Sequence, residues 1–271
     1  MLEYSNIAHQ EERRCAVSIA DVADASIEIA GGVASRGTPG LWLNTALAVG
    51  LTAPVSPDDV ARLAEFHEQV GAEPRLEVSP FSNPSLLREL AAAGFQLRGF
   101  ENVLYRELRP DEIVRPLQAT PPEVSVALLD ATDDDAVSAF ALAVATGFAD
   151  GDAPSSGSVD LTARSARHHR TASFAAYVGE LCVGGGSVEL LETQAALWGL
   201  SVLPEFRRRG IQQALLAARL NFSAQRGASL ATISGLPGMG TERNVRRLGF
   251  QLAYTKVVLT RPRAGLLPVS G

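Results

Sequence analysis

The sequence predicts an α+β protein built from two tandem lobes, each a mostly antiparallel sheet flanked by helices. The first observation behind this prediction is an internal repeat. Residues 94–106 (GFQLRGFENVLYR) and 249–261 (GFQLAYTKVVLTR) are identical at seven of thirteen positions without a gap. A helix-like stretch precedes the Gly-Phe pair in both halves, at 84–93 and at 241–248. Self-similarity of this kind indicates a tandem duplication.

A proline-rich stretch between the two copies is the second observation. It holds Pro110, Pro116, Pro121 and Pro122 among charged and polar residues, a composition typical of a linker. We therefore expect a first lobe at 1–115 and a second lobe at 116–271.

The third observation is the order of apolar runs in the second half. Val124–Leu129 alternates like a strand, and Thr132 is expected to cap a helix that ends near Gly147. After a polar loop and a helix, the runs 173–180, 181–192 and 195–203 follow, separated by turn residues as in an antiparallel meander. The remaining expected elements are a helix at 206–225, a strand at 230–233, a loop at 235–240, a helix at 241–248 and a final strand. One long helix thus crosses over within an otherwise antiparallel sheet.

Composition excludes several classes of protein. A formal charge of -6 argues against a protein whose main role is to bind nucleic acid or an anionic membrane. The two cysteines, Cys15 and Cys182, are too far apart for a CxxC metal site, so no metal is expected. No apolar stretch reaches the roughly 20 residues of a membrane span, and the N-terminus does not read as a signal peptide. We expect a cytoplasmic protein.

The segment 200–215 (LSVLPEFRRRGIQQAL) carries the clearest chemical signal. A strand ends at Pro204, and an arginine-rich turn with one glycine, Gly210, then opens a helix. The N-terminus of a helix presents free N–H groups and the positive end of the helix dipole, which together bind phosphate. Arg207, Arg208 and Arg209 would add positive charge for a polyphosphate.

This segment resembles the cofactor motif of the GNAT superfamily of N-acetyltransferases. The family pattern, Gln/Arg-x-x-Gly-x-Gly/Ala after a strand ending in Val-x-Pro, is matched by Val202-Leu-Pro204 and by Arg207 to Gln212. Gln212 departs from it, because the family has Gly or Ala at that position. The segment 241–250 (TERNVRRLGF) is similar to the second family signature, and the resemblance covers about 124–261.

The resemblance implies two tandem acyl-CoA N-acetyltransferase-like lobes, with acetyl-CoA as the cosubstrate of the second. The backbone of Leu200 and Val202 would bind the pantetheine arm at a strand bulge. The N–H groups of 208–212 would hold the pyrophosphate, and Asn244 would contact the cofactor from the opposite wall.

The sequence matches the family less well at the catalytic positions than at the cofactor motif. The resemblance implies a glutamate base near 195–197 and a tyrosine acid at 245, but the chain has Ala-Ala-Leu and Val245 there. Glu189 could act as a base through water, or it could be a solvated strand carboxylate. Tyr254 could be the acid, or it could be a packed core tyrosine. His168 and His169 are further candidates, with surface histidines at a helix end as the alternative.

The first lobe lacks the phosphate-binding pattern. Its equivalent segment, 52–60 (TAPVSPDDV), has neither arginine nor glycine and carries two aspartates that would repel a pyrophosphate. This lobe would complete the sheet, close the substrate cleft or form a homodimer. Asn44 and Glu101 are its candidate cleft residues.

The leading hypothesis is an N-acetyltransferase acting by direct attack of a primary amine, carried by a small molecule or an amino-acid-like acceptor. The alternatives are a non-catalytic acyl-CoA-binding or regulatory protein, and a purely structural protein in both lobes. The intact turn at 207–210 argues against the last of these.

Overall fold

The computed structural model describes residues 3–149 and 152–269, which form two compact units. Unit 1 contains the chain up to Val103 together with the chain from Leu252 onward, and unit 2 is Leu104–Gln251. This division differs from the predicted boundary at 115/116. The last strand, β11 (Gln251–Thr260), pairs antiparallel with β4 (Arg75–Val78), so it belongs with the first lobe.

Unit 1 contains a sheet in the order β1-β2-β3-β4-β11 and three helices. Its other elements are α1 (Tyr4–Val22), β1 (Ala25–Ile29), β2 (Gly32–Arg36), β3 (Thr45–Leu47), α2 (Pro57–Glu68), α3 (Pro84–Ala92) and the first part of β5 (Gln96–Glu107).

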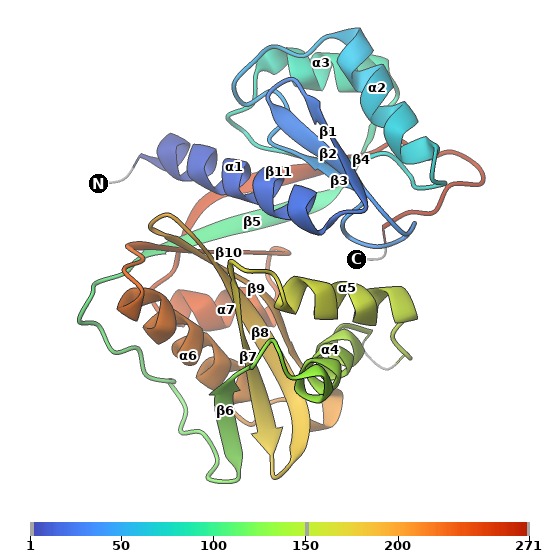
Figure 1. The fold of residues 1–271 in the computed structure, drawn as a ribbon. Helices are drawn as coiled ribbons and strands as arrows, with labels where there is room; N and C mark the ends of the chain where they lie inside the picture. The colour runs from blue at the N-terminus through green and yellow to red at the C-terminus, as the bar shows by residue number, and fades with distance from the viewer. Residues whose placement is uncertain (1–2, 150–151, 270–271) are drawn as a thin grey trace. The chain divides into compact units, whose positions relative to one another are not determined.

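Unit 2 contains a sheet in the order β10-β9-β8-β7-β6 (Figure 1). Its elements are β6 (Val124–Leu128), α4 (Asp134–Ala149), α5 (Ser156–Ala166), β7 (Thr171–Val178), β8 (Leu181–Leu191), β9 (Gln194–Val202), α6 (Ile211–Gln225), β10 (Leu230–Gly235) and α7 (Gly240–Arg247), with a 3-10 turn at Pro204–Phe206. None of the helices within the described ranges is long and apolar enough to cross a membrane.

The two units share one topology, as the repeat predicts. In unit 1, β1, β2 and β3 form an antiparallel meander, and α2 leads to β4, which is parallel to β3. In unit 2, β7, β8 and β9 form the same meander, and α6 leads to β10, which is parallel to β9. Each copy of the repeat begins at a glycine with positive φ after a short helix, Gly94 at 80° and Gly249 at 87°. Glycine adopts this conformation without strain, which explains its presence in both copies.

Helices cover both faces of the sheet in unit 2. A Cβ atom on Gly185 would collide with Phe140 of α4, whereas one on Gly186 would collide with Arg219 of α6. Successive strand residues point to opposite faces, so α4 and α6 lie on opposite sides of β8. Leu215, Leu216 and Leu220 of α6 are fully buried against the sheet.

Most of the predicted elements of the second half are present, with two corrections at helix starts. Asp133 caps α4, because its carboxylate accepts from the Ala136 N–H at 3.0 Å; the predicted cap, Thr132, donates to Asp130 instead. The crossover helix begins at Ile211 rather than near Phe206, since Pro204–Phe206 forms a 3-10 turn.

His67 of α2 is fully buried in unit 1, and burial lowers its pKa to about 4. Its Nε2 lies 3.0 Å from the Ser35 carbonyl, which a neutral ring with a protonated Nε2 satisfies. Below pH 6.5 the unfolded chain takes up a proton that the folded chain does not, so stability falls as pH drops toward 4. Between pH 7 and pH 5 we expect this histidine to remove about 2 kcal/mol from the free energy of unfolding.

Urea unfolding at pH 7 and pH 5 measures this loss. The control is His67→Gln, whose amide can donate to the same carbonyl but does not titrate. We expect the variant to lose about 2 kcal/mol less than the original chain over this interval. Equal losses in both chains would contradict the assignment.

Candidate functional site

The pairing of β9 with β10 ends partway along both strands of unit 2. The two strands are in parallel register from Gln194–Leu230 to Leu197–Ile233. Beyond that point β9 continues to Val202 and β10 to Gly235. The polar backbone of both strands is therefore available, after this point, to a ligand lying between them.

A bulge in β9 begins two residues after Leu197, the last residue of β9 that pairs with β10. Ser187 of β8 is opposite Trp198, and Gly185 is opposite Ser201, so Gly199 and Leu200 together face Gly186. Gly199 has a φ of +64°, as the extra residue of a bulge often does. The structure thus has a bulge at Leu200, where the family resemblance implied one, and Val202 is back in register opposite Gly184.

The turn between β9 and α6 holds two left-handed residues, Arg208 with a φ of +62° and Gly210 with a φ of +79°. Gly210 is the N-cap of α6, and no side chain caps this helix end. Backbone of this kind exposes N–H groups at the positive end of the helix dipole, a site typical of anion binding.

The three arginines of the turn differ in their contacts. Arg207 donates from Nε to the Val202 carbonyl at 3.1 Å and from Nη2 to the Gly147 carbonyl at 2.7 Å, so its guanidinium fastens the turn to β9 and α4. Arg209 donates to the Glu205 carbonyl and lies over the Phe206 ring, and both Arg208 and Arg209 are exposed. All three residues are exposed, and of the three Arg207 is the one held by backbone carbonyls of β9 and α4.

Gln212 and Asn244, two residues predicted to contact the cofactor, lie together. The Asn244 side-chain amide donates to Gln212 Oε1 at 2.9 Å, which joins the first turn of α6 to α7. The Gln212 side chain is thereby held by α7, although the family pattern has a small residue at its position.

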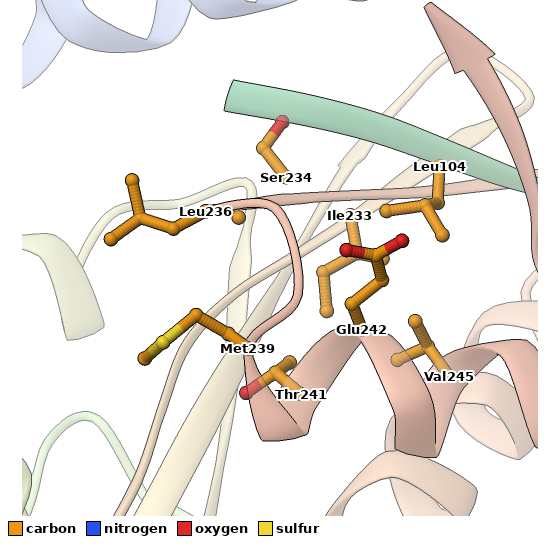
Figure 2. A pocket seen from close by; sticks show the side chains of 9 residues that line it. Leu104, Ile233, Ser234, Leu236, Met239, Thr241, Glu242 and Val245 are labelled. Carbon is orange, nitrogen blue, oxygen red and sulfur yellow. The ribbon is translucent and has the colours of Figure 1, made fainter. Parts of the chain in front are cut away.

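A shallow pocket lies where β10 ends (Figure 2). It is mostly apolar, and its lining residues are Leu104, Ile233, Ser234, Gly235, Leu236, Met239, Thr241, Glu242 and Val245. The Glu242 carboxylate accepts from the Gly238 N–H at 2.7 Å and pairs with Arg246. The sequence analysis did not predict this pocket, because it is formed in part by a glycine-rich loop that matches no motif. The local signal was the three glycines of that loop, Gly235, Gly238 and Gly240.

The two predicted catalytic residues are both engaged by the fold. Glu189 is buried on β8, and Arg170 donates from Nε to its Oε1 at 2.9 Å. Tyr254 belongs to unit 1, where its hydroxyl donates to the buried Glu12 at 2.6 Å. Burial and the Glu12 charge raise the pKa of Tyr254. Both catalytic roles stay predictions, and these contacts give each side chain a structural role.

The remaining candidate positions are 195–197 and the two histidines, His168 and His169. The positions 195–197 are buried apolar residues of β9. The rings of His168 and His169 lie just beyond α5, with centroids 4.4 Å apart and planes tilted by 42° to each other. Within the described part of the chain, no group of three His, Cys, Asp or Glu side chains could hold a metal ion.

The equivalent helix start in unit 1 is already occupied by an acidic side chain. Ser56 and Asp59 form a reciprocal capping box at the N-terminus of α2: Ser56 Oγ accepts from the Asp59 N–H at 3.2 Å, and Asp59 accepts from the Ser56 N–H at 3.0 Å. A carboxylate here repels an anion and satisfies the N–H groups that a phosphate would need.

Comparisons with known proteins agree with this geometry. The model of the Acetyltransferase (GNAT) family matches residues 147–250. A search of curated proteins finds no match. Among solved structures, a GCN5-related N-acetyltransferase from Kribbella flavida is 18% identical with a TM-score of 0.65, over 96% of both chains. A tandem GNAT protein from the clavulanic acid biosynthesis pathway is 18% identical with a TM-score of 0.57, over 84% of this chain and 77% of that one. Residues 147–250 are therefore similar to the GNAT acetyltransferase family, and the fold of the chain is similar to that of tandem GNAT proteins.

Proposed function

We propose that unit 2 binds acetyl-CoA and transfers its acetyl group to the primary amine of a small-molecule or amino-acid-like acceptor. The observation that carries this proposal is the uncapped start of α6, which follows a turn with two left-handed residues next to a bulged strand. The matching helix of unit 1 is capped by its own acid, so one acetyl-CoA is expected per chain.

The fit to acetyl-CoA rests on three groups of atoms. The N–H groups of 208–212 would hold the pyrophosphate at the positive helix end, with charge from Arg208 and Arg209. The backbone of Leu200 and Val202 would bind the amide-containing arm, where the pairing of β9 with β10 has ended. Asn244, held by Gln212, would contact the cofactor from α7.

Acetyl-CoA, when bound, supplies an activated acetyl group as a thioester. In the proposed reaction the acceptor nitrogen forms the C–N bond, the C–S bond breaks, and the CoA thiolate leaves while the nitrogen loses a proton. A lysine-like amine with a pKa near 10.4 is mostly protonated at pH 7, and its deprotonation costs ~4–5 kcal/mol. Because Glu189 is paired with Arg170, we assign the removal of this proton to water rather than to a carboxylate in direct contact.

A second function, an acyl-CoA-binding protein without turnover, is favoured by one observation. Val245, where the family resemblance implies a tyrosine acid, is completely buried and lines the pocket. A side chain without a titratable proton cannot protonate the leaving thiolate, so a non-catalytic protein would tolerate it.

Release of free thiol from acetyl-CoA in the presence of a panel of small amines tests the proposal. We expect amine-dependent release, and we expect Asn244→Ala to raise the KM for acetyl-CoA about tenfold with a smaller change in kcat. Tight acetyl-CoA binding without release for any amine would favour the non-catalytic function instead.

A further inference from the structure

Arg219 of α6 is a fully buried cation without a counter-ion. Its side chain is 0% exposed, and no carboxylate in the described part of the chain forms an ion pair with it. Burial alone lowers its pKa to about 9. An isolated buried guanidinium is costly to a fold, so its retention calls for a compensating use.

The hydrogen bonds of Arg219 converge on the β9 bulge. Nη1 donates to the Ser187 carbonyl at 2.9 Å and to the Trp198 carbonyl at 3.2 Å, which are the paired residues where the register breaks. Nε donates to the Leu215 carbonyl of its own helix at 3.1 Å. One guanidinium thus connects α6, whose N-terminus is the proposed phosphate site, to the bulge.

The approach of Arg219 to β8 depends on Gly186, the residue opposite the bulge. A Cβ atom at this position would lie 2.9 Å from Arg219 Cζ, closer than real side chains come. Because Gly186 lacks a side chain, the guanidinium can reach both carbonyls. The Nη2 atom is buried and has no hydrogen-bond partner within the described residues, so not all of the donor capacity of Arg219 is used by the fold.

We infer that Arg219 is a positioning residue for acetyl transfer, which fixes the bulge so that its backbone N–H groups meet the acetyl carbonyl. This inference rests on the proposed function. The Trp198 carbonyl belongs to the same peptide group as the Gly199 N–H. A cation bound to the oxygen of a peptide group polarises it, so the N–H becomes a stronger donor. A fixed, polarised donor also stabilises the negative charge that develops on the carbonyl oxygen during transfer.

Binding calorimetry with acetyl-CoA and with CoA separates positioning from a merely structural role. The variants are Arg219→Met, which removes the charge, and Arg219→Lys, which keeps it. For Arg219→Met we expect the affinity for acetyl-CoA to fall about fivefold, while the affinity for CoA stays within about twofold. The reason is that only acetyl-CoA has the thioester carbonyl that the bulge would contact. Arg219→Lys should recover part of the difference. Gly186→Ala, which keeps the arginine but displaces it, should act like Arg219→Met and serves if that variant does not fold.

If the variants lost affinity equally for acetyl-CoA and CoA, or lost none for either, the inference would be overturned. The bulge would then contact the acetyl group without help from Arg219. The original chain distinguishes this result from failure of the proposed function. If it binds neither acetyl-CoA nor CoA, both the proposed function and this inference are wrong.

Discussion

Replacing Gly210 by aspartate is expected to weaken acetyl-CoA binding at least about 100-fold while the protein stays folded. The carboxylate would stand at the N-terminus of α6, where the proposed pyrophosphate binds, and two negative groups would then share one site. Gly210 also has a φ of +79°, which costs a non-glycine residue roughly 1 kcal/mol. Isothermal titration calorimetry measures the affinity, and circular dichroism reports the fold.

Gly179→Asp is the matched control. Gly179 lies in the β7–β8 turn with a φ of +60°, and nothing lies within 4 Å of where its Cβ would be. The same strain and the same charge are therefore introduced away from the α6 turn. Unchanged affinity in Gly210→Asp, or an equal loss in Gly179→Asp, would contradict the placement of the phosphate site.

Replacing Lys256 by methionine is expected to destabilise the protein by about 3–5 kcal/mol, the usual cost of removing one partner from a buried ion pair. Lys256, the only lysine in the chain, is buried in unit 1, with Nζ 3.1 Å from Glu12 Oε1 and 3.2 Å from Glu77 Oε2. Burial already raises the pKa of Glu12, and loss of the ammonium group raises it further, whereas Glu77 keeps its ion pair with Arg75. Stability is then lost as the pH rises through the new pKa of Glu12. Urea unfolding should show a larger deficit at pH 8 than at pH 5.

The double variant Glu12→Gln/Lys256→Met tests the cause of this loss. Glu12 is completely buried and also accepts from Tyr254, a hydrogen bond that glutamine can keep. With one uncompensated charge removed, we expect at least half of the lost stability to return. If the double variant is less stable than Lys256→Met, the cost lies in packing of the lysine stem rather than in the unpaired charge.

Local patterns explain why much of unit 2 could be predicted from the sequence. The strands alternate with period two, the glycines mark residues of positive φ, and Pro204 ends β9 at Val202. The arginine-rich turn before α6 was predictable for the same reason, since its residues are contiguous in the sequence. Gly94 and Gly249 marked equivalent positions because both need a left-handed backbone.

The remaining features depend on contacts distant in sequence. β11 was expected in the second lobe, but its ladder partner is β4, and the choice of a strand's neighbour leaves no local pattern. The hydrogen bond from Tyr254 to Glu12 could not be predicted, because the two residues are 242 positions apart in the sequence. The hydrogen bonds of Arg219 to the Ser187 and Trp198 carbonyls also join residues distant in sequence, so no local pattern predicts them.

The stoichiometry of acetyl-CoA binding tests the central claim most directly. Calorimetric titration of the intact chain should give one bound acetyl-CoA per chain, because α6 has an uncapped N-terminus and α2 is capped by Ser56 and Asp59. Two bound molecules per chain would contradict the loss of the site in unit 1. No binding at millimolar acetyl-CoA would contradict the assignment of the α6 turn as a cofactor site, and with it the proposed acetyl transfer.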